Sequence, residues 1–252
     1  GVHSVNVDVL YGLPYQTLAS IEATIGQVLS LQPDRTALFG YAHVPWMKKH
    51  QQMIPDAALP DVSARFAQSQ LAASLLDSGG LHPVGFDHFA RASDSLAIAE
   101  RTGKLRRNFQ GYTDDRADLL IGLGASAIGQ LPQGYVQNIT PTGEYQKTVL
   151  AGGGATARGF ALTPADRLHG FAIEALLCRF ALTRQELLAV GTAGAVLFET
   201  ARAIASADED GLTMADADCF SVTPLGRPFV RTIAAKFDTY LAQGAARHSL
   251  AV

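Results

Sequence analysis

Residues 4–41 read SVNVDVLYGLPYQTLASIEATIGQVLSLQPDRTALFGY, and this stretch decides the fold. In residues 4–11, valines alternate with polar side chains, which is the period of a half-buried strand. The breakers Gly12 and Pro14 end that strand. Apolar residues then recur at helical spacing over residues 17–31, with Thr17 as the N-cap, and residues 36–41 form the next strand. The stretch predicts a strand, a helix and a second strand joined as a parallel βαβ unit.

The same alternation continues toward the C-terminus. Residues 60–78 predict a second helix that ends at Gly79-Gly80, and residues 84–86 predict a third parallel strand. A barrel strand delivers polar side chains at its C-terminal end, where Asp87 and His88 follow. Three such strands cannot close a barrel alone, so we expect earlier barrel units to precede Gly1. The inward side chains of the second helix are expected to be Val62, Phe66, Leu71, Leu75 and Leu76.

The rest of the chain divides into two parts. Residues 106–157 are glycine-rich and are predicted to be irregular, with Gly152-Gly153-Gly154 as a flexible joint. Residues 158–252 predict capped helices from Thr163 and Thr183, two short strands within residues 212–222, and a last helix from Thr223 to about Tyr240. Helices followed by a hairpin resemble a winged-helix unit. No clustered basic recognition helix is present, so a structural or lid role is favoured over DNA binding.

Composition sets the class of protein. The chain has 252 residues, is 48% hydrophobic and 17% charged, and has a net charge of −3, as expected of an ordinary soluble globular protein. No basic surplus points to nucleic acid and no apolar run is long enough for a membrane span. Cys178 and Cys219 suit a reducing cytoplasm, and two thiols cannot hold an iron–sulfur cluster unaided. We expect a cytoplasmic protein with neither nucleic acid nor membrane as a partner.

The segments GFDHFAR (residues 85–91) and RNFQGYT (residues 107–113) are the most unusual in the chain. The second places an arginine, two amides and two aromatic rings in seven residues, whereas ordinary surface loops use Gly, Pro, Ser and Asp. Such a loop favours a site for a planar or polar ligand. A tightly packed connector is the alternative that the residues leave open.

These segments belong to a longer series of motifs. The series runs DVLYGLPYQT (8–17), PDR and FGYAHVP (33–45), GFDHFAR, RNFQGYT, LIGLGASAI (120–128), QN (137–138), RGFALT (158–163) and TPLGRPFVRTIAAKFDTYL (223–241). In this order the motifs resemble those of the oxygen-independent coproporphyrinogen III oxidases, a radical S-adenosylmethionine (SAM) family. The resemblance spans nearly the whole chain and implies an α/β fold. Residues 1–105 would be the last units of a partial barrel with parallel strands, residues 106–157 a connector completing the SAM site, and residues 158–252 a mostly helical, winged-helix-like domain.

The resemblance also implies a reaction. Family members use a SAM-derived 5′-deoxyadenosyl radical to convert two propionates of coproporphyrinogen III to vinyl groups, which gives protoporphyrinogen IX in haem biosynthesis. A CxxxCxxC motif holds their [4Fe–4S] cluster, and this sequence lacks it, so we expect the motif before Gly1 and no metal ligand in this chain. The chain alone is then expected to be inactive. Two SAM molecules, an external electron donor and acceptor, and a monomeric state are further expectations.

Site residues follow from the motif positions. The resemblance places Asp8 and Ala42 beside the second SAM and Gln110 and Ile128 beside the cluster-bound one. Three of the four have an alternative: Asp8 pairing with a nearby cation, Gln110 bonding its own loop, and Ile128 lying in the core. Ala42 can offer only a van der Waals or backbone contact. Substrate contacts are expected from Arg107, Asp87 and His88, although the last two are equally compatible with a structural hydrogen-bonded pair.

A paralogous family gives the main functional alternative. The radical SAM haem chaperones share the YGLP and glycine-rich segments, but they typically show a YEISNFA-like strand end and an HNxxYW-like loop. This chain has GFDHFAR and RNFQGYT at those places, which resemble the oxidases. The alternative to an oxidase is therefore a non-catalytic, tetrapyrrole-binding protein.

Overall fold

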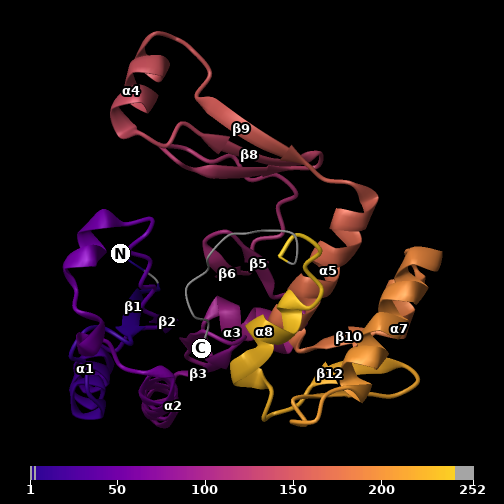
Figure 1. Cartoon of the computed structure of the whole chain (residues 1–252), viewed down its shortest axis with the longest axis horizontal. Helices are drawn as coiled ribbons and strands as arrows, with labels where there is room; N and C mark the ends of the chain where they lie inside the picture. Colours follow the sequence, from indigo (N-terminus) through magenta and orange to yellow (C-terminus); the bar gives the residue numbers. More distant parts are fainter. Residues whose placement is uncertain (1, 3, 242–252) are drawn as a thin grey trace.

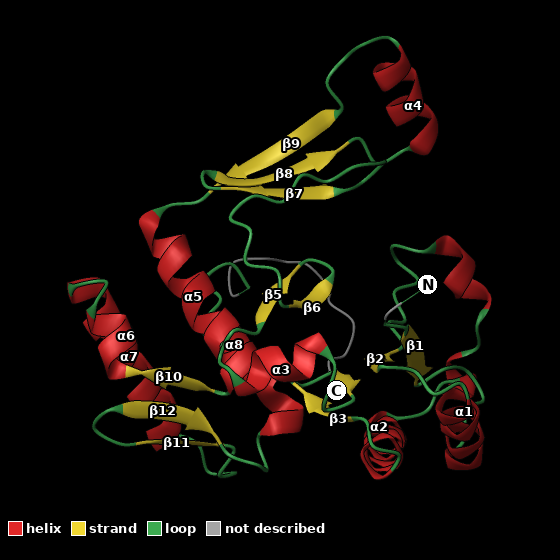
Figure 2. Ribbon diagram, turned by 180° about the vertical axis from the view of Figure 1, so that it is seen from behind, coloured by secondary structure: helices red, strands yellow, loops and turns green. Residues whose placement is uncertain are grey.

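The computed structural model describes residue 2 and residues 4–241. The N-terminal sheet with its helices lies at one side of the molecule, and the C-terminal helices lie at the other (Figure 1). A three-stranded sheet and helix α4 project from the rest of the chain, and the reverse view shows the same arrangement (Figure 2). The fold therefore combines several small sheets with helices packed against them, as expected of an α/β chain.

The N-terminal sheet contains the predicted βαβ unit. Strands β1 (Asn6–Tyr11) and β2 (Arg35–Gly40) pair in parallel, and helix α1 (Leu18–Ser30) connects them. Thr17 caps α1 in a capping box with Ser20, which confirms the predicted N-cap. The alternating pattern of the strand, the breakers Gly12 and Pro14 and the cap Thr17 all indicate the same strand–helix–strand unit. The sequence was therefore sufficient to predict it.

Helices α1 and α2 (Val62–Ser78) cover one face of this sheet. Ile21 and Ile25 of α1 and Leu76 of α2 form one buried cluster with Val9 and Tyr11 of β1. The inward stripe of α2 differs from the predicted one: Leu76 is buried and Leu71 and Leu75 pack against the cluster, but Val62 is 53% exposed. The buried positions of α2 are Arg65, Gln68, Ala72 and Leu76, and the first two bond the chain just after β1 and β2, through the Gly12 N–H and the Tyr41 carbonyl.

The predicted third parallel strand is wrong. Residues 85 and 86 lie in the turn of a hairpin between β3 (His82–Val84) and β4 (His88–Ala90), and β4 pairs antiparallel to β2. Gly85 has φ +61°, a conformation that favours glycine and turns the chain. A side chain there would also meet the Tyr112 ring, with a Cβ only 2.1 Å from its Cζ. The sheet order is β1-β2-β4-β3, so Asp87 and His88 precede and begin β4 instead of following a parallel strand.

Residues 106–157 are more regular than predicted. After helix α3 (Ser95–Arg101), the chain forms a hairpin of two strands, β5 (Arg106–Asn108) and β6 (Gly111–Thr113). The projecting sheet consists of β7 (Ile128–Leu131), β8 (Gly134–Asn138) and β9 (Thr156–Ala161). Helix α4 (Thr142–Leu150) connects β8 to β9. Glycine permits this packing, because a Cβ on Gly134 would lie 1.9 Å from the Phe160 carbonyl oxygen. The glycines here allow close strand approach and do not mark irregular chain.

The C-terminal part contains four helices, α5 (Pro164–Arg179), α6 (Arg184–Leu188), α7 (Thr192–Ser206) and α8 (Val230–Ala235). It also contains a small sheet whose strands lie in the order β10 (Ala181–Thr183), β12 (Cys219–Val222) and β11 (Thr213–Ala215). Capping boxes at Thr163 and Thr183 confirm both predicted helix starts. Short 3₁₀ turns lie at Lys49–Met53, Asp56–Ala58 and Arg227–Phe229, and the last helix ends at Ala235, earlier than predicted. The domain boundaries and the winged-helix likeness stay predictions.

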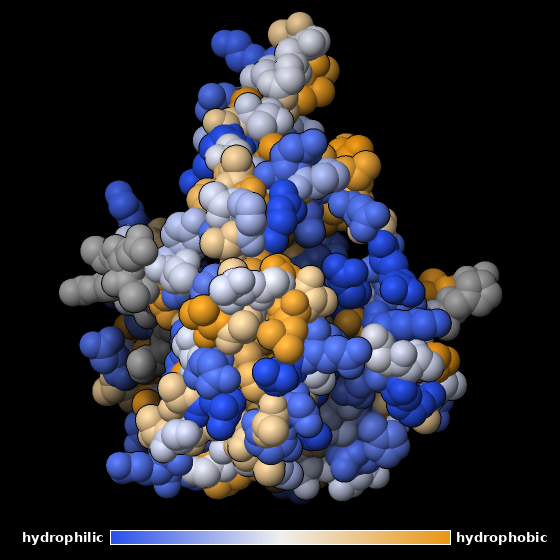
Figure 3. All heavy atoms as spheres, turned by 90° about the vertical axis from the view of Figure 1, so that its right-hand side faces the viewer, coloured by the Kyte–Doolittle hydropathy of each residue, from blue (hydrophilic) through white to orange (hydrophobic). Residues whose placement is uncertain are grey.

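Two properties of the structure bear on membrane insertion and on the character of the surface. Within the described residues, no helix is both long and apolar enough to cross a membrane. The face that carries α5 and α7 shows apolar side chains interspersed with polar ones (Figure 3). Val190 and Val196, which flank the start of α7, are exposed apolar residues.

Candidate functional site

One face of the N-terminal sheet is left open by the helices. Val9 and Tyr11 of β1 point into the helix-covered core, whereas Asn6, Asp8 and Leu10 are exposed on the opposite face. The register pairs Asp8 with Ala37 of β2 and Ala37 with His88 of β4. Paired residues point to the same side of a sheet, so Asp8 and His88 lie in one row on this face, where Asp8 is exposed and Ala37 and His88 are buried.

The Asp8 carboxylate is available to a ligand. Its Oδ1 atom accepts a hydrogen bond of 2.7 Å from the Asn6 side-chain amide. Within the described residues no cationic side chain forms an ion pair with it, which differs from the alternative of pairing with a nearby cation. An exposed carboxylate with spare acceptor positions can bind an ammonium or a hydroxyl group.

His88 belongs to a mostly buried cluster with Asp87 and Arg107. Its Nδ1 lies 2.6 Å from Asp87 Oδ1, and Asp87 also accepts from Arg107, at 3.2 Å to Oδ2. The Arg107 guanidinium lies between two rings, 4.7 Å from the Phe86 centroid and 4.6 Å from that of Tyr112. The three substrate residues predicted from the motifs are thus brought together, in the form of a mutual hydrogen-bonded cluster.

Tyr112 fixes this cluster in place. Its hydroxyl donates to the Leu177 carbonyl at 2.5 Å and accepts from the Phe86 N–H at 3.3 Å. Burial raises the pKa of the phenol far above its ordinary value, so the hydroxyl stays protonated and remains a donor. Tyr112 therefore ties the β3–β4 turn to α5. The sequence analysis did not assign it a role, although its place in RNFQGYT was a signal.

Gln110 lies at the tip of the β5–β6 hairpin. It is exposed, and its backbone N–H donates to the Asn108 side chain at 2.8 Å. Its own side-chain amide makes no hydrogen bond to the described residues, contrary to the alternative of bonding its own loop. Beside it, the exposed Phe109 ring packs edge-on against Tyr135, with centroids 4.9 Å apart. The hairpin tip thus presents a free amide and an aromatic ring.

Ala42 and Ile128 occupy separate places. Ala42 is exposed after β2, and its carbonyl accepts from the Gln51 side chain at 3.1 Å. Ile128 begins β7, is half-buried and pairs with Gln137. The four predicted SAM residues therefore lie on or beside three different sheets, which are separate in Figure 1. Within the described residues, no hydrogen bond joins any two of them.

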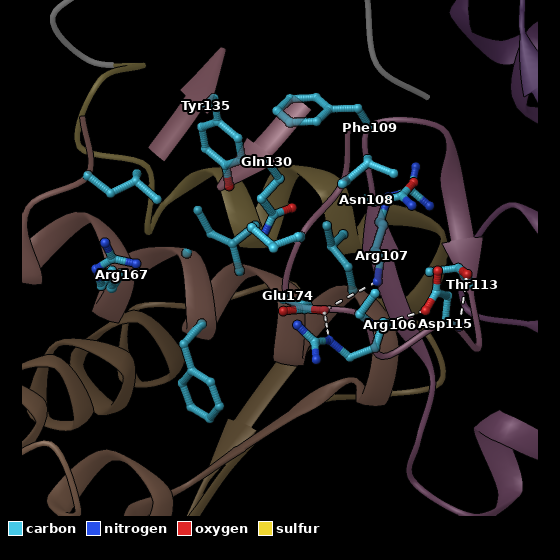
Figure 4. A pocket seen from close by; sticks show the side chains of 18 of the residues that line it. Arg106, Arg107, Asn108, Phe109, Thr113, Asp115, Gln130, Tyr135, Arg167 and Glu174 are labelled. Carbon is cyan, nitrogen blue, oxygen red and sulfur yellow. Dashed lines mark hydrogen bonds and ion pairs between the residues drawn. The ribbon is translucent and has the colours of Figure 1, made fainter. Parts of the chain in front are cut away.

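A cavity of about 500 Å³ lies behind the hairpin, between β5, β7–β8 and α5 (Figure 4). Arg106 Nε donates to Glu174 at 2.7 Å, and Glu174 also accepts from the Arg107 N–H at 3.3 Å. The hydrogen bond to Glu174 raises the pKa of Arg106. Arg167 donates to the Pro132 carbonyl, so the cations that line this cavity are already engaged. The sequence analysis missed Glu174, which no motif marks.

A second cavity, of about 270 Å³, lies between the sheet, α2 and α8. Phe66 of α2 and Phe229 stack across it with centroids 5.7 Å apart. Deeper in this region Arg65 is 8% exposed and donates to the Tyr41 carbonyl at 3.0 Å, while its Nε atom is buried without a partner among the described residues. Sequence reasoning missed Arg65, because position 65 reads as part of an ordinary amphipathic helix.

The two cysteines do not fit an iron–sulfur cluster. Cys178 is buried on α5, where burial raises the pKa of its thiol to about 12, and Cys219 is half-buried on β12, where burial also raises the pKa of the thiol. Cluster ligands are thiolates grouped around the metal. Among the described residues, no three His, Cys, Asp or Glu side chains are placed to hold a metal ion.

Several proteins with similar sequences carry the same name. No family model matches the chain. The chain is 46% identical over 95% of its length to an oxygen-independent coproporphyrinogen III oxidase from Cereibacter sphaeroides, of which it covers 53%, and 44% identical over its full length to one from Paracoccus denitrificans, of which it covers 56%. It is 41% identical over 97% of its length to the enzyme of that name from Thermostichus vulcanus, of which it covers 76%.

A solved structure agrees with these relatives. The fold matches coproporphyrinogen III oxidase from Escherichia coli, described as a radical SAM enzyme, with a TM-score of 0.85 and 38% identity over 95% of this chain and 56% of that one. The chain thus spans about half the length of most of these relatives. On this evidence, the chain belongs to the oxygen-independent coproporphyrinogen III oxidase family.

Proposed function

We propose that this chain is part of an enzyme that oxidatively decarboxylates two propionates of coproporphyrinogen III to vinyl groups, giving protoporphyrinogen IX in haem biosynthesis. The observation that carries the proposal is the exposed Asp8 carboxylate on the sheet face opposite the helices, which forms no ion pair with the described residues. The hairpin with its free Gln110 amide supports it. These features occur in a chain that matches a solved radical SAM enzyme along 95% of its length.

The residues present fit SAM, which is positively charged and rich in hydrogen-bonding groups. The Asp8 carboxylate would accept from an ammonium or ribose hydroxyl of the second SAM, beside the chain at Ala42. Gln110 would hydrogen-bond the first SAM, and Ile128 would supply an apolar contact. When bound, SAM and a reduced [4Fe–4S] cluster supply the radical that removes a substrate hydrogen.

The residues present do not fit the cluster itself, as the positions of Cys178 and Cys219 show. We propose that other residues of the full-length protein bind it and that this chain alone does not cleave SAM. Within the reaction, the chain would hold SAM and the tetrapyrrole and keep the Asp87–His88–Arg107 cluster ordered. An external electron donor and acceptor, a monomeric state and a cytoplasmic location complete the proposal.

The haem chaperone paralogue is the second candidate. Its segments differ where this chain has GFDHFAR and RNFQGYT, and here these two segments join through the Arg107–Asp87 ion pair and the Phe86–Tyr112 contact. The two distinctive segments form one cluster beside the sheet face that carries Asp8. This arrangement favours the oxidase over the haem chaperone.

The test compares this chain with the full-length protein that contains it. Both are reconstituted anaerobically with iron and sulfide, given SAM and a reductant, and assayed for 5′-deoxyadenosine. We expect 5′-deoxyadenosine from the full-length protein only. Its formation by this chain alone would refute the proposed division of the site. Stoichiometric haem binding by a full-length protein that leaves coproporphyrinogen III unchanged would replace the oxidase with the chaperone.

A further inference from the structure

The Asp87–His88 pair leaves one ring nitrogen unused. The Nδ1 atom lies 2.6 Å from the Asp87 carboxylate, which can only accept, so Nδ1 carries a proton. The other nitrogen, Nε2, makes no hydrogen bond to any residue of the described part of the chain. His88 is only 7% exposed, so its ring is held firmly while this atom stays free. An imidazole fixed through Nδ1 presents Nε2 to a partner in a defined direction.

The charge of the cluster determines what that partner can be. Arg107 donates to both oxygens of Asp87, at 3.4 Å and 3.2 Å, so guanidinium and carboxylate neutralise each other. With a neutral imidazole, the three side chains carry no net charge. Nε2 then offers a lone pair, which accepts a hydrogen bond, and the cluster offers no spare cation for a carboxylate. The pattern suits a neutral N–H donor better than a propionate.

A glycine of the β5–β6 hairpin lies beside the Nε2 edge of the ring. A Cβ on Gly111 would lie 3.3 Å from Nε2, so the hairpin backbone passes close to the ring and a larger residue here would press on this atom. Gly111 has φ +134°, which favours glycine at this position. His88 shares its row of the open sheet face with Asp8. A ligand bound beside Asp8 would therefore lie on the side of the sheet to which the His88 ring points.

We propose that His88 Nε2 accepts a hydrogen bond from a pyrrole N–H of the tetrapyrrole substrate, while Asp87 and Arg107 are positioning residues that do not touch the substrate. This inference rests on the proposed function, because it names a substrate contact within it. It also reassigns the motif residues: of the three expected to meet the substrate, two are engaged with each other.

The contact has a consequence for the reaction. After hydrogen abstraction, the substrate radical gives one electron to the external acceptor, the bond to the carboxylate breaks to release CO₂, and the electron pair of that bond becomes the second bond of the vinyl group. No proton leaves the pyrrole in this step. A hydrogen bond accepted from the pyrrole N–H stabilises the positive charge that develops as the electron departs.

The test uses the full-length protein, kept anaerobic and labelled with ¹⁵N-histidine, with coproporphyrinogen III as the ligand. NMR should show His88 with a protonated Nδ1 and an unprotonated Nε2. Addition of coproporphyrinogen III should shift the Nε2 resonance and leave Nδ1 protonated. Asp87→Asn should move the proton to Nε2, because an amide can donate to Nδ1. A purely structural role would not couple this tautomer to the ligand.

Calorimetry provides the second arm. His88→Ala should weaken coproporphyrinogen III binding about tenfold, the loss of one hydrogen bond. The matched control is His82→Ala, at an exposed histidine that pairs with Asp77 at 2.7 Å, and it should bind as the wild type does. If His88→Ala does not fold, the wild-type NMR arm still decides.

The outcomes separate the inference from the proposed function. Binding of coproporphyrinogen III with an unchanged Nε2 resonance would overturn the inference and leave the function standing. Unaltered affinity of a folded His88→Ala variant would do the same. Failure of the wild-type protein to bind coproporphyrinogen III would contradict the proposed function.

Discussion

At the residue scale, the candidate site depends on a few side chains whose positions are fixed by hydrogen bonds to their neighbours. Asp87 binds both His88 and Arg107, and Tyr112 anchors the turn that carries them. Asp8 and Gln110, in contrast, keep side-chain groups available to a ligand. The structure thus separates residues that order the site from residues that can bind, a distinction that the motifs alone did not make.

Gln110→Ala should weaken SAM binding in the full-length protein. The exposed side-chain amide lacks a partner among the described residues, so its loss removes a ligand contact without disturbing the fold. We expect about a fivefold to tenfold weaker affinity, the effect of one hydrogen bond. Calorimetry measures it, with Gln52→Ala as the control on another exposed amide. Unchanged SAM affinity would remove Gln110 from the site.

Tyr112→Phe should destabilise the protein by about 1–3 kcal/mol, because it leaves the Leu177 carbonyl and the Phe86 N–H without their partner. Urea unfolding gives the free energy. Tyr15→Phe, at a side chain that is 77% exposed, is the control and should change it by less than about 0.5 kcal/mol. Equal stabilities of the two variants would contradict the anchoring role of Tyr112.

At the element scale, agreement between sequence and structure follows local signals. The β1–α1–β2 unit and the starts of α5 and α6 were predictable because period, breakers and caps lie within a few residues of each other. The β3–β4 hairpin was not, because its turn depends on Tyr112, which is distant in sequence. The row that joins Asp8 to His88 depends on antiparallel pairing across β2, and no local pattern encodes that register.

The cap of α5 predicts a pH dependence of stability. The backbone hydrogen bond from Thr163, with further bonds from the Thr163 and Tyr240 hydroxyls, lowers the pKa of Asp166 below its ordinary value of 3.8. The ionised carboxylate therefore stabilises the folded state above that ordinary value, and this contribution is lost as the pH falls through the lowered pKa. Urea unfolding across the acid range should show a weaker decline for Asp166→Asn than for the wild type.

The control for this prediction is Asp114→Asn, at a carboxylate that makes no hydrogen bond to the described residues. Its stability should follow the wild-type decline with pH. Identical acid profiles for Asp166→Asn and the wild type would show that the capping box of α5 does not contribute this pH dependence.

At the scale of the whole molecule, the proposed function assigns this chain the parts of the site that bind and orient, because its thiols do not fit the metal centre. Cys178 is buried with a pKa raised to about 12, and Cys219 is half-buried. In the native chain, iodoacetamide should modify Cys219 faster than Cys178, because the reactive species is the thiolate and Cys178 is inaccessible. Mass spectrometry after timed quenching measures the two rates. In urea both should react alike; faster native labelling of Cys178 would contradict its burial.

The central claim is that this chain belongs to a catalyst of porphyrinogen decarboxylation. The most direct measurement is the anaerobic conversion of coproporphyrinogen III by the full-length protein with SAM, a reductant and an electron acceptor, followed by chromatography of the oxidised products. We predict protoporphyrinogen IX, formed only when SAM is present. A reconstituted protein that cleaves SAM to 5′-deoxyadenosine but leaves coproporphyrinogen III unchanged would contradict the claim.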